Sequence, residues 1–193
     1  MIVTFLGSTV KEYLNIFLYK LAQMKLKCPI CGSALVGYET YQRKLKTPDG
    51  KEEFPIARYY CPKCNKTHAI LPDFILPYKH YPAKVIEEAV EEVVEKQVTP
   101  EYVDGEQDIS TTKRWVKTFK LLYSEILGTL ESIAFRLYNR TSSLMKEIGG
   151  CFSRLKTVLK LMPDILSCCL FGKINTWFTV ENTNLWLLGK KST

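Results

Sequence analysis

The sequence predicts an α+β protein, with a small antiparallel β-hairpin sheet near the N-terminus and a mostly α-helical region after it. Three observations predict this class. Two Cys-x-x-Cys pairs enclose 29 residues of strand character. Prolines at 72, 77 and 82 then interrupt regular structure, and from residue 83 onward apolar residues recur every three or four positions.

The two cysteine pairs, Cys28-Pro-Ile-Cys31 and Cys61-Pro-Lys-Cys64, support the sharpest chemical prediction. Two intervening residues let both sulfurs of a pair face one metal ion at about 2.3 Å, and four thiolates surround Zn²⁺ tetrahedrally. Such a complete shell has no open position for a catalytic water. We therefore predict an N-terminal zinc ribbon with a structural Zn²⁺ bound by Cys28, Cys31, Cys61 and Cys64.

Three alternatives stay open at this site. The cysteines can pair as disulfides, although four of seven cysteines in paired spacing, in a chain that shows no secretory leader, favour metal. Iron also binds to Cys-Pro-x-Cys turns of the rubredoxin kind. His68, four residues after Cys64, is a rival ligand, but it also stands where the next strand should begin.

The elements around the cysteines follow from local patterns. Residues 2–6 are apolar and partly β-branched, which predicts a strand that joins a neighbouring sheet. Residues 11–24 predict a short helix capped by Ser8 or Thr9. The hairpin turns at residues 48–50, and residues 68–71 return beside it as a further strand. Because a ribbon of about 50 residues has little core, we expect the metal to supply much of its folding free energy.

The helical region begins at residue 83 with an amphipathic helix, whose glutamates are predicted to form its solvent-exposed face. Pro100 ends this helix. A turn-rich link follows at residues 101–108. The next helix starts near residue 111 and is expected to close at Gly149-Gly150. Another helix spans residues 152–171 with a bend or break at Pro163, and no element is assigned to residues 172–193.

These elements predict four segments. Residues 1–26 form an N-terminal strand and helix segment, and residues 27–81 form the zinc ribbon. Residues 82–130 form a helix-turn-helix-like region, and residues 131–193 form a C-terminal helical region.

Charge points to a polyanionic partner, since the formal net charge is +7 and the isoelectric point is near 9.0. Residues 1–81 hold 12 basic and 6 acidic side chains, residues 82–109 hold 2 and 9, and residues 110–193 hold 13 and 5. The hairpin and the start of the long helix are therefore the two candidate DNA contacts. The predicted DNA-binding residues are Arg43, Lys44, Lys46, Thr112, Lys113, Arg114 and Lys117. The competing interpretations are a solvated hairpin face and plain packing of two amphipathic helices.

Enzyme chemistry finds no support in the sequence. The chain has two histidines, no glycine-rich phosphate loop and no nucleophile elbow. We therefore expect no catalytic residues and no small-molecule substrate. No stretch reaches the roughly 18 uncharged apolar residues of a spanning helix, so we expect no membrane partner and a cytoplasmic location.

Several motifs together resemble a known group. They are Cys28-Pro-Ile-Cys31-Gly, Arg58-Tyr-Tyr-Cys61-Pro-Lys-Cys64, Thr67-His68-Ala-Ile-Leu-Pro-Asp-Phe-Ile-Leu-Pro77 and Thr-Thr-Lys-Arg-Trp115. In this order they resemble short bacterial proteins of unassigned function that are similar to the N-terminal zinc-ribbon and helix-turn-helix part of insertion-sequence transposases. The resemblance implies DNA binding associated with a mobile element and four cysteines as metal ligands. It implies no nuclease, because the helical remainder is too short to supply a catalytic domain with three carboxylates.

The sequence as a whole thus predicts a zinc-dependent DNA-binding protein that is transposase-like but lacks a catalytic domain. The alternative is a zinc-ribbon protein-interaction module. In that case the ribbon and the apolar stripe from Trp115 to Leu137 would dock onto a transposase or another protein partner.

Overall fold

The structure is a computed structural model that describes residues 1–47, 50–141, 149–183 and 185–189. Its contacts divide the chain into two compact units. Unit 1 consists of Met1–Lys84 and Leu166–Thr193, and unit 2 consists of Val85–Ile165. This division cuts the chain differently from the four predicted segments, because the C-terminal residues group with the N-terminal ones. The described residues form one four-stranded sheet, five α-helices and a short 3₁₀ helix, so the mixed α and β class is confirmed.

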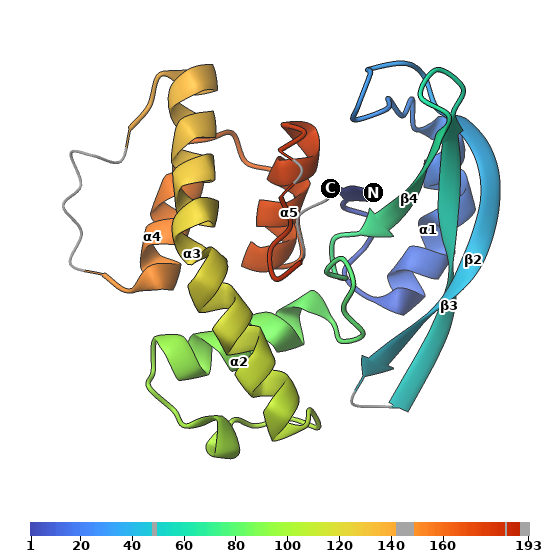
Figure 1. Ribbon diagram of the computed structural model, residues 1–193. Coiled ribbons are helices and arrows are strands. Elements are labelled where there is room, and N and C mark those ends of the chain that lie inside the picture. Colours follow the sequence, from blue (N-terminus) through green and yellow to red (C-terminus); the bar gives the residue numbers. More distant parts are fainter. Residues whose placement is uncertain (48–49, 142–148, 184, 190–193) are drawn as a thin grey trace. The chain divides into compact units, whose positions relative to one another are not determined.

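The sheet of unit 1 has the strand order β1-β4-β3-β2. The strands are β1 (Ile2–Thr4), β2 (Val36–Thr47), β3 (Gly50–Cys61) and β4 (Lys66–Pro72). β1 pairs with β4 in parallel, whereas the other neighbours are antiparallel. The predicted hairpin, its returning strand and the added N-terminal strand are therefore all present. Figure 1 shows β2 and β3 as a long, curved hairpin.

The hairpin pairs from Val36 opposite Tyr60 to Thr47 opposite Gly50. Residues 48 and 49 of the predicted turn lie outside the described residues. Gly50 has φ of 121°, a conformation that glycine adopts without steric cost. Leu45, Phe54 and Ile56 are almost fully buried, while most side chains of β2 are exposed. One face of the hairpin thus covers a core, and β2 forms the free edge of the sheet.

α1 (Val10–Gln23) lies against this sheet (Figure 1) and confirms the predicted first helix. Thr9 caps it by accepting a hydrogen bond from the Glu12 backbone N–H at 3.2 Å. Tyr13 is fully buried, packs edge-on against Phe54 with 5.6 Å between ring centroids, and donates its hydroxyl to the Pro55 carbonyl at 2.7 Å. Unit 1 therefore has an aromatic core, and the expectation of a ribbon with little core is wrong.

The C-terminal residues complete unit 1 through α5 (Leu170–Val180), most of which lies in the part of the predicted C-terminal helical region where no element was assigned. The Val3 backbone N–H donates to the Thr179 hydroxyl at 3.0 Å, which holds α5 beside β1. Asp73 follows β4, is fully buried, and accepts hydrogen bonds from the Ser167 hydroxyl and the Cys168 backbone N–H. Burial raises the pKa of this carboxyl, and the two hydrogen bonds oppose the rise.

Unit 2 contains most of α2 (Ala83–Val94), the 3₁₀ helix η1 (Pro100–Tyr102), α3 (Ile109–Tyr138) and α4 (Cys151–Lys160). The expected end of α3 at Gly149-Gly150 is wrong, because Asn139 adopts a left-handed conformation and closes the helix. The break expected at Pro163 within residues 152–171 is present, but it is wider than expected. α4 ends at Lys160, Pro163 disfavours a helical conformation in the residue before it, and the next helix begins at Leu170.

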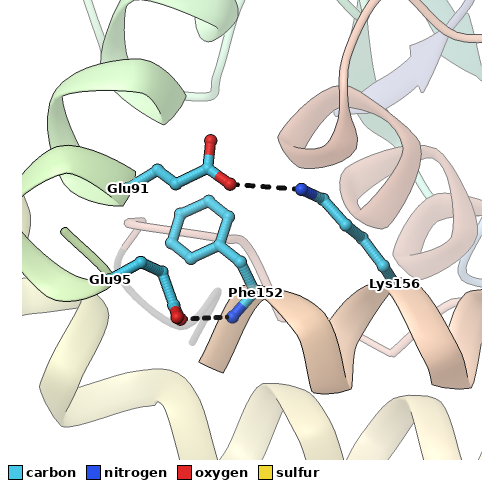
Figure 2. A network of polar contacts seen from close by, with 4 residues as sticks. All are labelled: Glu91, Glu95, Phe152 and Lys156. Atoms are coloured by element: carbon cyan, nitrogen blue, oxygen red, sulfur yellow. Dashed lines mark hydrogen bonds and ion pairs between the residues drawn. The ribbon is translucent and has the colours of Figure 1, made fainter. Parts of the chain in front are cut away.

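One glutamate of α2 and another directly after this helix contact α4, as Figure 2 shows. Glu95 Oε1 accepts a hydrogen bond from the Phe152 backbone N–H at 2.8 Å, and Glu91 Oε1 lies 3.1 Å from Lys156 Nζ. The Lys156 Nζ also lies 6.0 Å from the centroid of the Phe152 ring. The prediction of a purely solvated acidic face is therefore wrong for Glu91 and Glu95, which hold the N-terminal end of α4.

Substitution of Glu95 by alanine should destabilise unit 2, because it removes a carboxylate that caps α4. Loss of a helix N-cap of this kind costs about 1 kcal/mol. Chemical denaturation followed by circular dichroism measures the change. Glu106→Ala, in the exposed link before α3, is the matched control and should leave the free energy of unfolding unchanged. Equal stability of the two variants would contradict the capping role.

Candidate metal centre

The two cysteine pairs fold as nearly identical turns. In the first, the Gly32 backbone N–H donates to the Cys28 carbonyl at 2.8 Å, and Gly32 has φ of 71°. In the second, the Asn65 backbone N–H donates to the Cys61 carbonyl at 2.9 Å, and Asn65 has φ of 55°. Glycine and asparagine are the residues that best tolerate this left-handed conformation. The residue four positions after each first cysteine thus closes the turn.

Backbone N–H groups of these turns point at sulfur. The Ile30 N–H donates to Cys28 Sγ and the Cys64 N–H donates to Cys61 Sγ, both at 3.4 Å. Such hydrogen bonds stabilise a negative charge on the sulfur atom. Each turn therefore directs a backbone donor at the sulfur atom of its first cysteine.

The four sulfur atoms converge on one point. All lie within 4.8 Å of one another, with 3.8 Å between the sulfurs of Cys28 and Cys64 and 3.6 Å between those of Cys31 and Cys61. Four sulfurs placed tetrahedrally at 2.3 Å from one ion are separated by about 3.8 Å. Cys28 and Cys61 are buried, whereas Cys31 and Cys64 are partly exposed. The cluster could therefore hold a metal ion, with one side toward solvent.

Without a cation, the crowded sulfurs compete for negative charge. The hydrogen bond between Cys31 and Cys64 lowers the pKa of Cys31 to about 6 and raises the pKa of Cys64 to about 12. The opposite directions have one cause, because a thiolate on one member of the pair disfavours ionisation of the other. A divalent ion removes this conflict, since it stabilises all four thiolates at once.

His68 lies beside the cluster on β4. Its side chain is buried, and its Nε2 lies 3.4 Å from Cys28 Sγ. Burial lowers the pKa of the imidazole, and Lys66 contributes in the same direction. The four cysteine sulfurs form the converging group by themselves, so His68 is placed to support Cys28 as a hydrogen-bonding neighbour.

The predicted DNA-binding residues of the hairpin all lie on β2, but they differ in their contacts. Arg43 donates from Nη2 to the carbonyls of Leu76 at 3.3 Å and Lys79 at 2.7 Å, so it binds its own chain. Lys44 Nζ lies 2.7 Å from Glu53 Oε1, and both side chains are largely exposed. Lys46 is exposed and lies over a neighbouring tyrosine ring.

The predicted residues of α3 belong to unit 2 and do not form a uniform surface. Thr112 is only 1% exposed, and Lys113 Nζ lies 2.7 Å from Glu101 Oε1. Arg114 and Lys117 are exposed. The link between α2 and α3 spans residues 95–108 and contains η1, which is longer than the three or four residues of a tight helix-turn-helix. The helix-turn-helix interpretation thus gains no support from this geometry.

Sequence reasoning missed a cleft of about 670 Å³ on unit 1, beside β2. The residues that line it are Tyr41, Gln42, Arg43, Lys44, Lys46, Lys51, Tyr78 and His80. Three of them are predicted DNA-binding residues, but Tyr78 and His80 were not singled out for this role. The only sequence signal was the aromatic and basic composition of residues 77–82, which the prolines marked as a mere connector.

Comparison with known proteins gives one family match. Residues 28–115, somewhat under half of the chain, match the model of a family described as a domain of unknown function (DUF6431). The matched region begins at Cys28, includes all four clustered cysteines and ends at Trp115. No curated protein and no solved structure matches the chain. The resemblance to transposases therefore stays a prediction.

Within the residues that the structure describes, no helix combines the length and the apolar character needed to cross a membrane.

The purified, reduced protein should contain one divalent ion per chain, measured by elemental analysis together with thiol titration. Cys64→Ser should abolish stoichiometric metal, because three sulfurs cannot complete the shell. Cys151→Ser, a cysteine of unit 2 outside the cluster, is the matched control and should retain full metal content. Metal-free wild-type protein with four reactive thiols in the cluster would contradict the assignment.

Proposed function

We propose that this protein binds DNA and that its four clustered cysteines hold a structural Zn²⁺ ion. The observation that carries the proposal is the position of the cysteine cluster at the open end of a hairpin whose other end is basic. The whole hairpin, Val36–Cys61, has five basic and four acidic side chains, but residues 43–51 near its turn have four basic and one acidic. A strand pair with cations gathered at one end can contact a phosphate backbone there and release its counterions.

Zinc is the metal that best fits the cluster. The donors are four sulfurs at tetrahedral spacing, which is the donor set of structural zinc sites and, less commonly, of iron. All four positions are occupied by protein ligands, so the ion would stabilise the fold and not bind a reacting water. A colourless, metal-loaded protein distinguishes zinc from iron.

The hairpin has stronger support as the DNA contact than the start of α3. Thr112 is buried, and Lys113 pairs with Glu101 as Lys44 pairs with Glu53, so the first turns of α3 add Arg114 and Lys117 as exposed cations that line no described cleft. By contrast, Lys44, Lys46 and Lys51 of the hairpin are exposed and line one cleft. We therefore assign the main phosphate contacts to the hairpin.

The association with a mobile element rests on the resemblance to transposase N-terminal regions and is part of the same proposal. The rival role, docking to a protein partner through the stripe from Trp115 to Leu137, has weaker support. Trp115, Phe119 and Leu130 are buried, and Phe119 packs against Phe152 of α4 with 5.4 Å between ring centroids. That stripe already serves to pack helices of unit 2.

The Zn²⁺-loaded protein should bind DNA with an affinity that falls steeply with salt. Each phosphate contact contributes about 0.9 to the slope of log affinity against log salt for a duplex and about 0.7 for a single strand. Fluorescence anisotropy with labelled DNA in both forms measures the slope. Binding that is absent at low salt, or that does not change with salt, would contradict the proposal.

Paired charge variants locate the contact. Lys44→Gln with Lys46→Gln should lower the slope by about 1.4 to 1.8, the amount expected for two lost phosphate contacts. Arg114→Gln with Lys117→Gln removes the same charge from α3 and should change the slope much less. The reverse order of effects would assign the contact to α3.

A further inference from the structure

The cleft beside β2 is built by specific contacts and is not an accidental hollow. The Lys46 backbone N–H donates to the His80 carbonyl at 2.7 Å, and Arg43 Nη2 donates to the carbonyls of Leu76 and Lys79. These bonds tie residues 76–80 to the free edge of the sheet. The segment therefore forms a wall of the cleft, opposite exposed side chains of the hairpin.

Tyr78 is the most unusual residue of that wall. Its backbone has φ of 63°, the left-handed region that bulky side chains rarely adopt, and its side chain is 60% exposed. Burial in the core does not explain this conformation, since the ring is largely in solvent. Sparsely populated backbone conformations that the surrounding structure maintains are concentrated at ligand sites. In this case the consequence is an accessible aromatic ring at the cleft.

The charges around the cleft favour an anion. Arg43, Lys44, Lys46 and Lys51 line it, and Lys46 lies opposite Lys51 in the hairpin register. Among the described residues, an acidic partner of these cations is Glu53, which pairs with Lys44. Both partners of that pair are more than half exposed, so the pair is weak and can exchange for a phosphate.

The volume of about 670 Å³ matches sites that take small organic groups, which range from about 300 to 1,000 Å³. A ligand that combines a negative charge with a flat ring would satisfy the lysines and the tyrosine together. In a duplex the bases stay stacked and paired, so a duplex presents only phosphates to such a hollow. A base can enter the cleft only when it is unpaired.

We propose that this cleft binds an unpaired nucleotide of a DNA strand, with its base stacked on Tyr78 and its phosphates near Lys44, Lys46 and Lys51. This inference rests on the proposed DNA-binding function and adds that single-stranded DNA is the preferred form. Exposed aromatic rings beside lysines are the usual elements of single-strand binding surfaces.

The test compares the full-length, Zn²⁺-loaded protein and its variants by fluorescence anisotropy. The probes are a labelled DNA strand of about 12 nucleotides, within the range of single-strand binding sites, its duplex, and an RNA of the same sequence. Wild-type protein should bind the DNA strand more tightly than the duplex. Tyr78→Asn should weaken binding of the strand roughly 5- to 150-fold, the contribution of one base stacked on an aromatic ring.

Asparagine is chosen because it tolerates the left-handed backbone at position 78 while removing the ring. Tyr102→Asn, an exposed tyrosine of η1 outside the cleft lining, is the matched control and should bind like the wild type. Lys51→Gln gives a second, independent variant that should lower the salt slope by about 0.7, whereas exposed Lys63→Gln, outside the cleft lining, should not.

The outcomes separate the two proposals. Salt-dependent binding that does not prefer the single strand, or that is unchanged by both Tyr78→Asn and Lys51→Gln, overturns the cleft assignment and leaves the proposed DNA binding intact. Tighter binding of RNA than of DNA also overturns the assignment. Absence of binding to either DNA form at low salt overturns the proposed function and the cleft assignment together.

Discussion

The convergence of two cysteine turns at the open end of the hairpin is the constraint on which the proposed binding surface of unit 1 depends. Cys28 and Cys31 precede β2, Cys61 ends β3 and Cys64 follows it, so the cluster joins the chain segments at the open end of the hairpin. Nearer the turn, Arg43 and Lys46 hold the hairpin through the segment that follows β4. The cysteine cluster and the hydrogen bonds of Arg43 and Lys46 thus restrain the two ends of one long, exposed strand pair.

Between these two ends the hairpin depends on apolar packing. The sequence suggested that the metal supplies much of the folding free energy, and this packing reduces that role. Tyr13 of α1, Phe54 of β3 and Phe74 after β4 form an aromatic cluster, and Trp186 belongs to the same core. A buried core of this kind contributes stability without any ion. The metal is therefore expected to order the cysteine turns and the strand ends, and the core to maintain the rest of unit 1.

The features that could be predicted from the sequence are those set by residues close together in the chain. Cysteine spacing identified the cluster, strand character identified the hairpin, and Thr9 marked the start of α1, because each signal acts within a few positions. The failures have two physical causes. Asn139 ended α3 through a left-handed cap that apolar periodicity does not report. Contacts over long sequence separations, such as Asp73 with Ser167 and Val3 with Thr179, gave the C-terminal residues a place that no local pattern encodes.

The cleft was also beyond the reach of local sequence patterns, and its position indicates how the proposed metal and the proposed ligand would be coupled. Its lining joins residues of β2 and Lys51 of β3 to Tyr78 and His80, which become neighbours only because β4 returns beside β3 and the following segment folds back onto β2. None of the four cysteines lines the cleft. Loss of the ion should therefore weaken ligand binding by loosening β2 and β3, because it removes no group that contacts the ligand. A metal effect on affinity would then be transmitted along the hairpin, and it should decrease in variants that stiffen these strands by other means.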